Sequence, residues 1–254
     1  MISYPNAKVN LALNILRRRP DGFHDLQSVF LPYKGLTDIL EINPSDTFSV
    51  NIEGCTWDPM SDLTVKAWKL MSDKYGIAPV SIRMVKRIPV GAGLGGGSSD
   101  AAFALQMMNE MFSLGLPDAA LAADAATLGS DCAFFIFNRP MLAEGRGEIL
   151  SDIEVNLDGY VLKVVSPEGI SVSTKEAYSG VRPREACGRE IPDLRAALKQ
   201  PVNMWKDLLV NDFEESVFAV HPTLASIGPR LYEEGAVYAS MSGSGSSFFG
   251  IFRK

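Results

Sequence analysis

A glycine-rich stretch, Pro89–Ala102, constrains this chain more than any other feature of its sequence. It reads Pro-Val-Gly-Ala-Gly-Leu-Gly-Gly-Gly-Ser-Ser-Asp-Ala-Ala and holds five of the chain's 22 glycines. Because glycine loses more conformational entropy on folding than any other residue, this concentration indicates that something approaches the backbone closely. Ser98, Ser99 and Asp100 favour the N-cap of a helix, and a helix-forming run follows them. Free N–H groups in a loop that leads into a helix bind anions, so the stretch predicts a phosphate site.

Two common classes of phosphate loop do not fit this stretch. A Walker A loop ends in Gly-Lys-Ser/Thr, whereas Gly97 is followed directly by Ser98. The spacing Gly-x-Gly-x-x-Gly that begins at Gly91 matches the dinucleotide fingerprint, but that fold needs a second strand after the helix. Residues 116–128 predict another helix instead. A flexible linker is disfavoured because the stretch lies between a strand pattern and a helix pattern.

Composition and charge narrow the class of protein. With 254 residues, of which 46% are hydrophobic and 21% charged, the chain is long enough for one large or two modest domains. Its net charge of −6 disfavours non-specific nucleic-acid binding, which depends on many lysine and arginine contacts to phosphate. No apolar run approaches the roughly 18 residues of a membrane span, and the first residues lack a secretory signal. Three widely spaced cysteines indicate neither a disulfide framework nor a thiolate zinc site, so we expect a cytoplasmic protein that binds neither nucleic acid nor membrane.

Hydrophobic periodicity predicts the elements near the N-terminus. Residues 8–15 alternate strictly, which indicates a half-buried strand with Lys8 and Asn10 on its polar face. The pattern alone leaves two interpretations equally open, a solvated face and a face that lines a site. A helix is expected over residues 63–75, and Gly76 is suited to end it.

The segments on either side of the glycine-rich stretch carry charged residues. A strand over residues 81–88 leads into the stretch and places Lys86 close enough to help neutralise a bound phosphate. After the helices, residues 129–137 predict a helix end followed by a buried strand, with Asp131 at the junction. A lone aspartate in such a turn is more often a helix cap than a catalytic residue. Further along the chain, residues 143–148 form another glycine-rich turn, with an exposed arginine.

The second half of the chain predicts a mixture of helices and strands. A polar stretch at residues 151–158 is a plausible domain boundary, and a strand follows it. Helical patterns precede two short terminal strands, a combination that suits an α+β sandwich. Between those strands, Met241–Ser246 forms a turn of small residues, which we call the second turn. A flexible hairpin and a contact with a ligand or with the glycine loop are equally open for this turn.

Six motifs together resemble the GHMP small-molecule kinases and extend over almost the whole chain. They are Pro5-Asn-Ala-Lys8-Val-Asn10-Leu, Pro20-Asp-Gly-Phe-His24, Pro89–Ala102, Gly129-Ser-Asp131, Ile170-Ser-Val-Ser-Thr174 and Met241-Ser-Gly-Ser-Gly245. The glycine loop is similar to that of the whole superfamily. The Asp-Gly-Phe-His segment, found together with Ala-Lys-x-Asn-Leu, resembles the branch that phosphorylates the 2-hydroxyl of a cytidine diphosphate derivative in the non-mevalonate isoprenoid pathway.

The resemblance implies the α+β, two-domain GHMP kinase fold. Residues 1–150 would form a ribosomal-protein-like α/β N-terminal domain that binds ATP, and residues 151–254 a ferredoxin-like C-terminal domain. The enzyme would be a phosphotransferase with an alcohol group as acceptor. Its cofactors would be ATP and Mg²⁺, its partner a small-molecule cytidine diphosphate derivative, and the chain would be a monomer or a homodimer.

The resemblance also implies the catalytic residues. Asp131 matches the family's catalytic aspartate and Lys8 its partner lysine. Asp131 would accept the proton of the substrate hydroxyl, while Lys8 would keep that carboxylate charged and steady the developing charge. Asn10 would make a polar contact at the same substrate site. No acidic cluster provides an obvious magnesium site, so the metal ligands stay unknown, with Ser99 as the best candidate.

The remaining site residues follow from the same resemblance. Phe23 and Tyr178 would stack on the cytosine, His24 would hydrogen-bond to its edge, and Thr174 would contact the pyrophosphate or sugar. The residues implied for ATP are Lys86, Pro89, Gly91, Gly93, Leu94, Gly95, Gly96, Gly97, Ser98 and Ser99.

One position departs from the family pattern. Asp62 precedes Leu63 where the family has an asparagine that helps to read adenine. A carboxylate accepts hydrogen bonds but donates none unless it is protonated, so we expect the adenine contact to change or to move to the backbone. Two alternatives remain at this point, another GHMP kinase acting on mevalonate, homoserine or a sugar, and a catalytically silent nucleotide-binding regulator.

Overall fold

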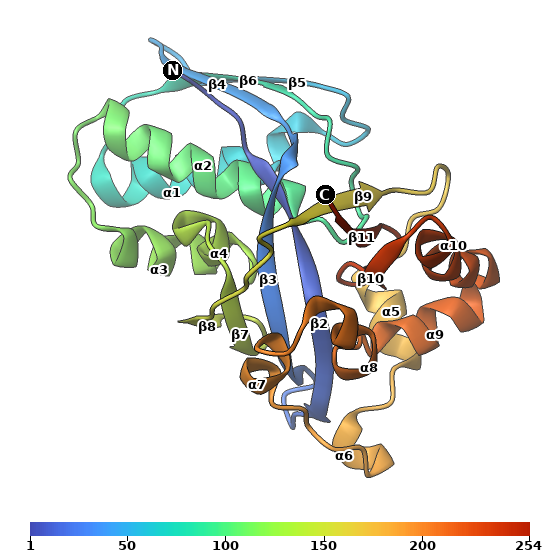
Figure 1. The fold of residues 1–254 in the computed structure, drawn as a ribbon. Helices are drawn as coiled ribbons and strands as arrows, with labels where there is room; N and C mark the ends of the chain where they lie inside the picture. Colours follow the sequence, from blue (N-terminus) through green and yellow to red (C-terminus); the bar gives the residue numbers. More distant parts are fainter. The chain divides into compact units, whose positions relative to one another are not determined.

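The computed structural model describes residues 1–254, which form strands and helices in mixed order (Figure 1). The strands are β1 (Ile2–Ser3), β2 (Asn6–Arg18), β3 (His24–Thr37), β4 (Ile39–Pro44), β5 (Ser49–Glu53), β6 (Val80–Val85), β7 (Met141–Gly145), β8 (Ile149–Asp152), β9 (Tyr160–Val165), β10 (Ala236–Met241) and β11 (Phe248–Arg253). The α-helices are α1 (Leu63–Tyr75), α2 (Gly96–Met111), α3 (Asp118–Leu128), α4 (Cys132–Phe137), α5 (Thr174–Gly180), α6 (Arg184–Cys187), α7 (Leu194–Leu198), α8 (Trp205–Leu208), α9 (Phe213–Val220) and α10 (Ile227–Glu233). Short 3₁₀ helices lie at Pro59–Ser61, Val202–Met204 and Pro222–Ser226. None of the helices combines the length and the apolar character that crossing a membrane requires.

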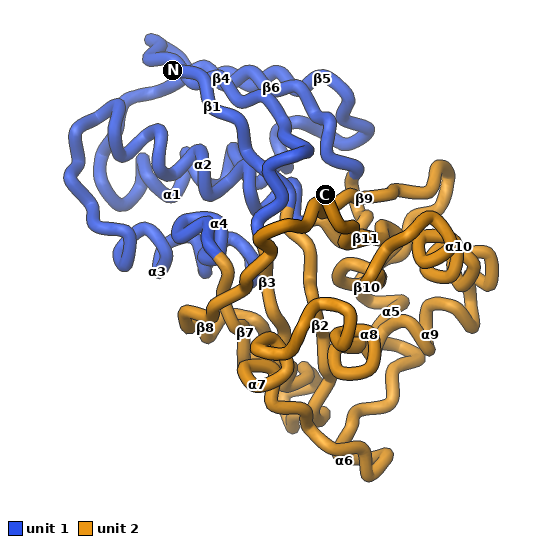
Figure 2. The backbone as a smooth tube through the Cα atoms, viewed as in Figure 1, with its two compact units in different colours: residues 1–7, 32–89, 95–139 blue, residues 8–31, 90–94, 140–254 orange.

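The chain packs into two compact units, which Figure 2 shows in different colours. Unit 1 comprises residues 1–7, 32–89 and 95–139, and unit 2 comprises residues 8–31, 90–94 and 140–254. Both units are therefore discontinuous in sequence. The domain boundary at residue 150, which the family resemblance implies, stays a prediction. The two units are defined differently, by which segments of the chain pack together.

Unit 1 contains a four-stranded sheet in the order β1-β4-β6-β5, in which β5 and β6 run parallel. Along β6, Val80, Ile82 and Met84 are buried, while Arg83 points to the opposite face and is exposed. This is the two-residue period of a strand with one covered face. Helices α1 and α2 lie along one face of the sheet (Figure 1).

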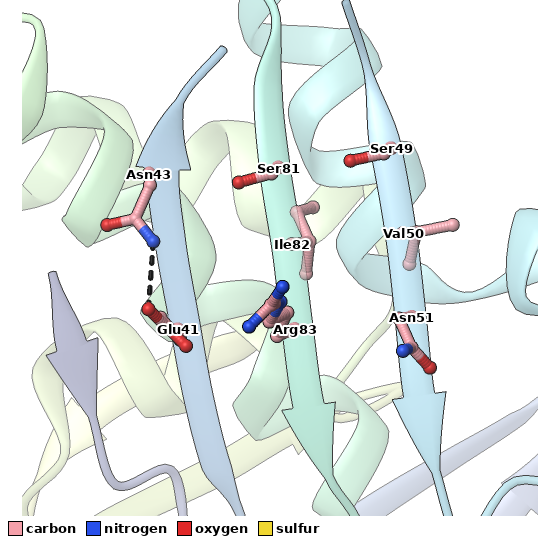
Figure 3. Close-up of a pocket in the computed structure, with 8 residues that line it drawn as sticks. All are labelled: Glu41, Asn43, Ser49, Val50, Asn51, Ser81, Ile82 and Arg83. Carbon is pink, nitrogen blue, oxygen red and sulfur yellow. Dashed lines mark hydrogen bonds between the residues drawn. The ribbon is translucent and has the colours of Figure 1, made fainter.

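The other face of this sheet is polar (Figure 3). The strand register sets Arg83 between Glu41 on β4 and Asn51 on β5. These residues line a hollow of about 370 Å³ together with serines of β5 and β6. Opposite charges on neighbouring strands stabilise each other modestly. The face therefore has the character of a solvated sheet surface.

Helix α1 has the bounds that the sequence predicts. It begins after Asp62, whose side chain accepts a hydrogen bond from the N–H of Thr64, and it ends at Gly76 with a φ of +68°. The strand expected over residues 8–15 is also confirmed, as the central part of β2.

Two predictions of local structure are wrong. Helix α2 begins at Gly96, so Ser98, Ser99 and Asp100 lie inside the helix, at its third to fifth positions, and do not cap it. The buried strand expected within residues 129–137 is instead the helix α4. A short continuous apolar run reads the same way in a buried strand and in a buried helix, so periodicity cannot separate them.

Unit 2 is built on two sheets, in the orders β2-β3-β7-β8 and β10-β11-β9. Leu13 and Ile15 of β2 share a hydrophobic cluster with Phe213 of α9, Met241 of β10 and Phe248 of β11. Burial of large apolar side chains is the main stabilising contribution to such a core. The shared cluster explains why the long N-terminal strands pack with the C-terminal half of the chain.

A buried ion pair connects β2 to the C-terminal part of unit 2. Asp212 accepts two hydrogen bonds from the guanidinium of Arg184, both at 2.8 Å, and a third at 2.8 Å from the backbone N–H of Ile15. Both charged side chains are almost completely buried. Removing one partner of such a pair leaves an uncompensated charge in the interior.

We therefore predict that Asp212→Ala destabilises the fold strongly, by about 3–5 kcal/mol in the free energy of unfolding. The control is Glu215→Ala, because Glu215 pairs with Arg182 and Arg189 but is half exposed. That change should cost no more than about 1 kcal/mol. Urea unfolding of both variants measures the difference, and equal losses would contradict a structural role for the buried pair.

Candidate active site

The glycine loop before α2 uses conformations that favour glycine. Gly91, Gly93 and Gly95 have φ values of +67°, +76° and +72°. Residues with a Cβ atom rarely adopt such values. The clustering of glycines in the sequence thus reflects a backbone requirement at these three positions.

The second turn of small residues packs directly on this loop. A Cβ atom at Gly93 would lie 2.0 Å from the carbonyl oxygen of Ser242. The Ser242 hydroxyl donates to the carbonyl oxygen of Gly93 at 3.0 Å, and the N–H of Ser247 donates to that of Ala92 at 3.1 Å. Of the interpretations open for the second turn, the contact with the glycine loop is the one observed.

A residue that the sequence did not single out supports the second turn. The side-chain amide of Asn211 donates to the carbonyl oxygens of Met241 and Gly243, both at 2.8 Å. Asn211 itself is buried. Its partners are 30 and more residues away along the chain, so no local pattern could have indicated this role.

The start of α2 is arranged to receive an anion. Gly95 occupies the N-cap position, and no side chain caps the helix. The first N–H groups of an α-helix have no partner within the helix, and the helix dipole favours negative charge there. The Ser99 hydroxyl in this turn is buried without a hydrogen-bond partner.

A buried cluster of charged side chains in unit 1 connects the residues just before the glycine loop with the helix that follows it. The ammonium of Lys86 is bonded to the carboxylates of Asp38 and Asp100. Burial by itself lowers the pKa of Lys86, but the attraction of Asp100 and Asp38 outweighs it and raises the pKa above its usual value. Lys86 therefore stays charged. The sequence indicated Lys86 but neither of its acidic partners.

The polar face of β2 lies in unit 2. The ammonium of Lys8 donates to the side-chain oxygen of Asn10, whose amide nitrogen donates to the Ser28 hydroxyl at 2.8 Å. Lys8 and Asn10 are buried, so the interpretation of this face as a solvated surface is wrong. Asp131 belongs to unit 1, where it directly precedes α4 and its side chain does not cap that helix.

Aromatic residues gather at the start of β3 in unit 2. The rings of His24 and Tyr178 are stacked, with centroids 4.9 Å apart, and Tyr178 meets Phe213 edge-on at 4.8 Å. Phe23 is 54% exposed, and the guanidinium of Arg146 lies 4.9 Å from its ring centroid. Burial, with a smaller contribution from nearby Arg18, lowers the pKa of His24 below its usual value. His24 is therefore neutral at pH 7.

The structure also defines the local contacts of Thr174, a predicted site residue, and of Asp62, the residue that departs from the family pattern. Thr174 opens α5, and its hydroxyl lies 3.5 Å from that of Ser244 in the second turn. The Asp62 carboxylate is engaged by the N–H and hydroxyl of Thr64 at 2.9 and 2.7 Å, and by the indole N–H of Trp57 at 3.2 Å. Aspartate at this position thus serves as a helix cap.

Comparison with known proteins finds relatives that match almost the whole chain. The family model described as GHMP kinases N terminal domain matches residues 62–139. A 4-diphosphocytidyl-2-C-methyl-D-erythritol kinase of Bacteroides thetaiotaomicron is 48% identical over 260 residues, which cover 99% of this chain and 92% of that protein. A crystal structure of 4-(cytidine 5'-diphospho)-2C-methyl-D-erythritol kinase has a TM-score of 0.84 and 34% identity, covering 98% of this chain and 89% of that one. A crystal structure of mevalonate kinase, with a TM-score of 0.75 and 14% identity over 100% of this chain and 91% of that one, shares the fold.

Because the glycine loop packs on the second turn at Gly93, we predict that Gly93→Ala strongly lowers the free energy of unfolding. The added methyl group must displace the Ser242 carbonyl, and overpacking of this kind costs about 1–3 kcal/mol in addition to about 1–2 kcal/mol for the positive φ. Gly159→Ala is the matched control, because Gly159 has a φ of +79° and no atom lies within 4 Å of the place that its added methyl group would take. Urea unfolding should show a clearly larger loss for Gly93→Ala, and equal losses would show that φ alone matters.

Proposed function

Because the chain belongs to the GHMP kinase family, and within it to the 4-diphosphocytidyl-2-C-methyl-D-erythritol kinases, we propose that it phosphorylates the 2-hydroxyl of 4-diphosphocytidyl-2-C-methyl-D-erythritol with ATP. The products are the 2-phosphate and ADP. The observation that carries this proposal is the full-length likeness to a kinase of that name, at 48% identity over 99% of the chain. The fold shared with mevalonate kinase supports phosphoryl transfer less specifically.

The glycine loop and the first turn of α2 are proposed to hold the ATP phosphates. The residues assigned to this role are Pro89, Gly91, Gly93, Leu94, Gly95, Gly96, Gly97, Ser98 and Ser99. Support comes from the three glycines with positive φ and from the uncapped N-terminus of a 16-residue helix. The free backbone N–H groups at the N-terminus of a helix point outward and can bind phosphate oxygens. Adenine is proposed to be read without the Asp62 carboxylate, which already has three donors.

Magnesium is proposed to accompany ATP. No group of three or more histidine, cysteine, aspartate or glutamate side chains gathers to hold a metal ion. Mg²⁺ commonly keeps several waters and binds through substrate phosphates and one or two protein groups. The partnerless Ser99 hydroxyl fits one such ligand. A bound Mg²⁺ would supply neutralisation of the charge on the transferring phosphoryl group.

Asp131 and Lys8 are proposed to carry the chemistry on the acceptor side. The substrate 2-hydroxyl oxygen attacks the γ-phosphorus, its proton passes to the Asp131 carboxylate, and the bond from the γ-phosphorus to the ADP oxygen breaks. The ammonium of Lys8 is buried and oriented by Asn10, so it is suited to stabilise negative charge. Asn10 in turn is proposed as a polar contact for the substrate. A positioned general base typically contributes about 10²–10⁴ in rate.

The cytidine part of the substrate is proposed to bind at the aromatic residues of unit 2. Phe23 has an exposed ring on which a base can stack, and Tyr178 supplies a second ring. A neutral imidazole at His24 has one donor and one acceptor, which complements the hydrogen-bonding edge of cytosine. Thr174 is proposed to contact the pyrophosphate or sugar.

The kinase proposal predicts that Asp131→Asn lowers kcat by about 10²–10⁴, because the variant cannot accept the hydroxyl proton. The measurement is release of ADP by purified protein with ATP, Mg²⁺ and the cytidyl substrate. Asp118→Asn is the control, since Asp118 is exposed and also lies at the start of a helix. Undiminished turnover by Asp131→Asn would refute the general-base role. A silent wild-type protein would favour a regulator, and activity only on mevalonate, homoserine or a sugar would favour another kinase of the fold.

The nucleoside site predicts that Phe23→Ala weakens CMP and CDP binding by about 5- to 150-fold, the loss expected for one stacked base. Isothermal titration calorimetry measures this affinity directly. Tyr4→Ala removes an equally exposed aromatic ring from unit 1 and should leave CDP binding unchanged. If both variants bound CDP as tightly as the wild type, the cytosine would not stack on Phe23.

A further inference from the structure

Asp38 fastens the chain segment that enters the glycine loop. It lies between β3 and β4 and is completely buried. One oxygen of its carboxylate accepts hydrogen bonds from the backbone N–H groups of Arg87 and Ile88, at 2.5 and 2.8 Å. The other oxygen accepts from the ammonium of Lys86. The carboxylate of Asp38 therefore accepts hydrogen bonds from three consecutive residues, 86–88, directly before Pro89.

Lys86 connects that segment to the far end of the loop. Its ammonium also donates to the carboxylate of Asp100 at 2.5 Å, and Asp100 is the fifth residue of α2. A Cβ atom at Gly96 would lie 3.4 Å from this ammonium and 2.9 Å from a methyl carbon of Ile88. The start of α2 thus rests on the Lys86 side chain and on the segment that Asp38 holds.

The charge balance of this cluster does not suit a phosphate ligand. Two carboxylates face one ammonium, and the Lys86 side chain is only 4% exposed. The ammonium's charge is already compensated before any nucleotide binds. A phosphate in contact with Lys86 would have to displace side chains that already occupy the buried ammonium.

We propose that Lys86, with Asp38 and Asp100, is a positioning group that fixes both ends of the glycine loop, and that it affects ATP through the loop and without touching the phosphates. The inference rests on the proposed function, since it concerns how the kinase holds ATP. Buried charged groups stabilise a fold poorly, and their best-attested use is to select one arrangement of the chain. Small displacements of a positioned group reduce rates steeply, so a fixed loop matters for phosphoryl transfer.

The first test uses the protein without nucleotide. We expect Lys86→Met to speed hydrogen exchange at the N–H groups of Arg87, Ile88 and Asp100 by about 10-fold or more, because both anchors of the loop are released. Lys74→Met is the control, since Lys74 pairs with Asp124 away from the loop and is 54% exposed. Unchanged exchange in Lys86→Met would overturn the proposal, because a lysine that only contacts phosphate has no effect before ATP binds.

The second test is a double-mutant cycle on the KM for ATP. Lys86→Met and Asp100→Leu should each raise this KM by about 10- to 100-fold, the cost of a displaced positioning element. The double variant should be no more impaired than the more impaired single variant, because Lys86→Met already removes the Lys86–Asp100 pair that Asp100→Leu breaks. The KM for the cytidyl substrate should change less than about 2-fold, since the connection lies at the ATP loop. Multiplied losses in the double variant would show that Lys86 acts directly on ATP and would overturn the proposal.

Conservative variants keep the test decisive if a substitution fails to fold. Asp100→Asn retains an oxygen that accepts from Lys86, so it should recover most of the ATP affinity that Asp100→Leu loses. If Asp100→Asn were as impaired as Asp100→Leu, the connection would not be the cause. Should the protein lack ATP-dependent activity altogether, the exchange measurement still decides the positioning role, so failure of the kinase proposal is distinguishable from failure of this one.

Discussion

The backbone contact between Gly93 and Ser242 is the constraint on which the rest of the candidate site depends. With the Ser242 carbonyl oxygen 2.0 Å from where a Cβ atom would stand, only glycine fits at position 93. The Ser242 hydroxyl donates to Gly93 and also accepts from the backbone N–H of Asn10 at 3.3 Å. One serine thus joins the glycine loop to β2, the strand that carries Lys8. Gly93 and Ser242 therefore fix the path of the glycine loop, and the hydrogen bond from Asn10 connects that path to the polar face of β2.

The sites proposed for the nucleotide and for the acceptor use different kinds of chemical group. The loop and the first turn of α2 offer backbone N–H groups, which distinguish phosphate from other groups but carry no information about the acceptor. Mevalonate kinase shares the fold at 14% identity, so the fold alone leaves the acceptor open. We propose that side chains select the cytidine diphosphate derivative, namely Phe23 in the turn before β3, His24 on β3 and Tyr178 on α5.

Local sequence patterns predicted β2 and α1 well, because alternation and helical periodicity are properties of neighbouring residues. The same reasoning failed for α4, whose short apolar run is compatible with a buried strand. Partners distant in sequence were beyond its reach. Asp38 meets Lys86 across 48 positions, and Asn211 meets the second turn across 30. Family resemblance supplied the candidate residues, while the tertiary structure alone showed that Lys86 is engaged by two carboxylates.

Phosphorus NMR of a reaction that contains ATP, Mg²⁺ and 4-diphosphocytidyl-2-C-methyl-D-erythritol tests the assigned activity most directly, because it follows the transferred atom itself. The predicted result is a new phosphomonoester resonance that grows in step with ADP while the cytidine diphosphate linkage stays intact. It should be absent when the cytidyl substrate is left out. Release of the γ-phosphate as inorganic phosphate, or transfer to mevalonate or homoserine in place of the cytidyl substrate, would contradict the assignment.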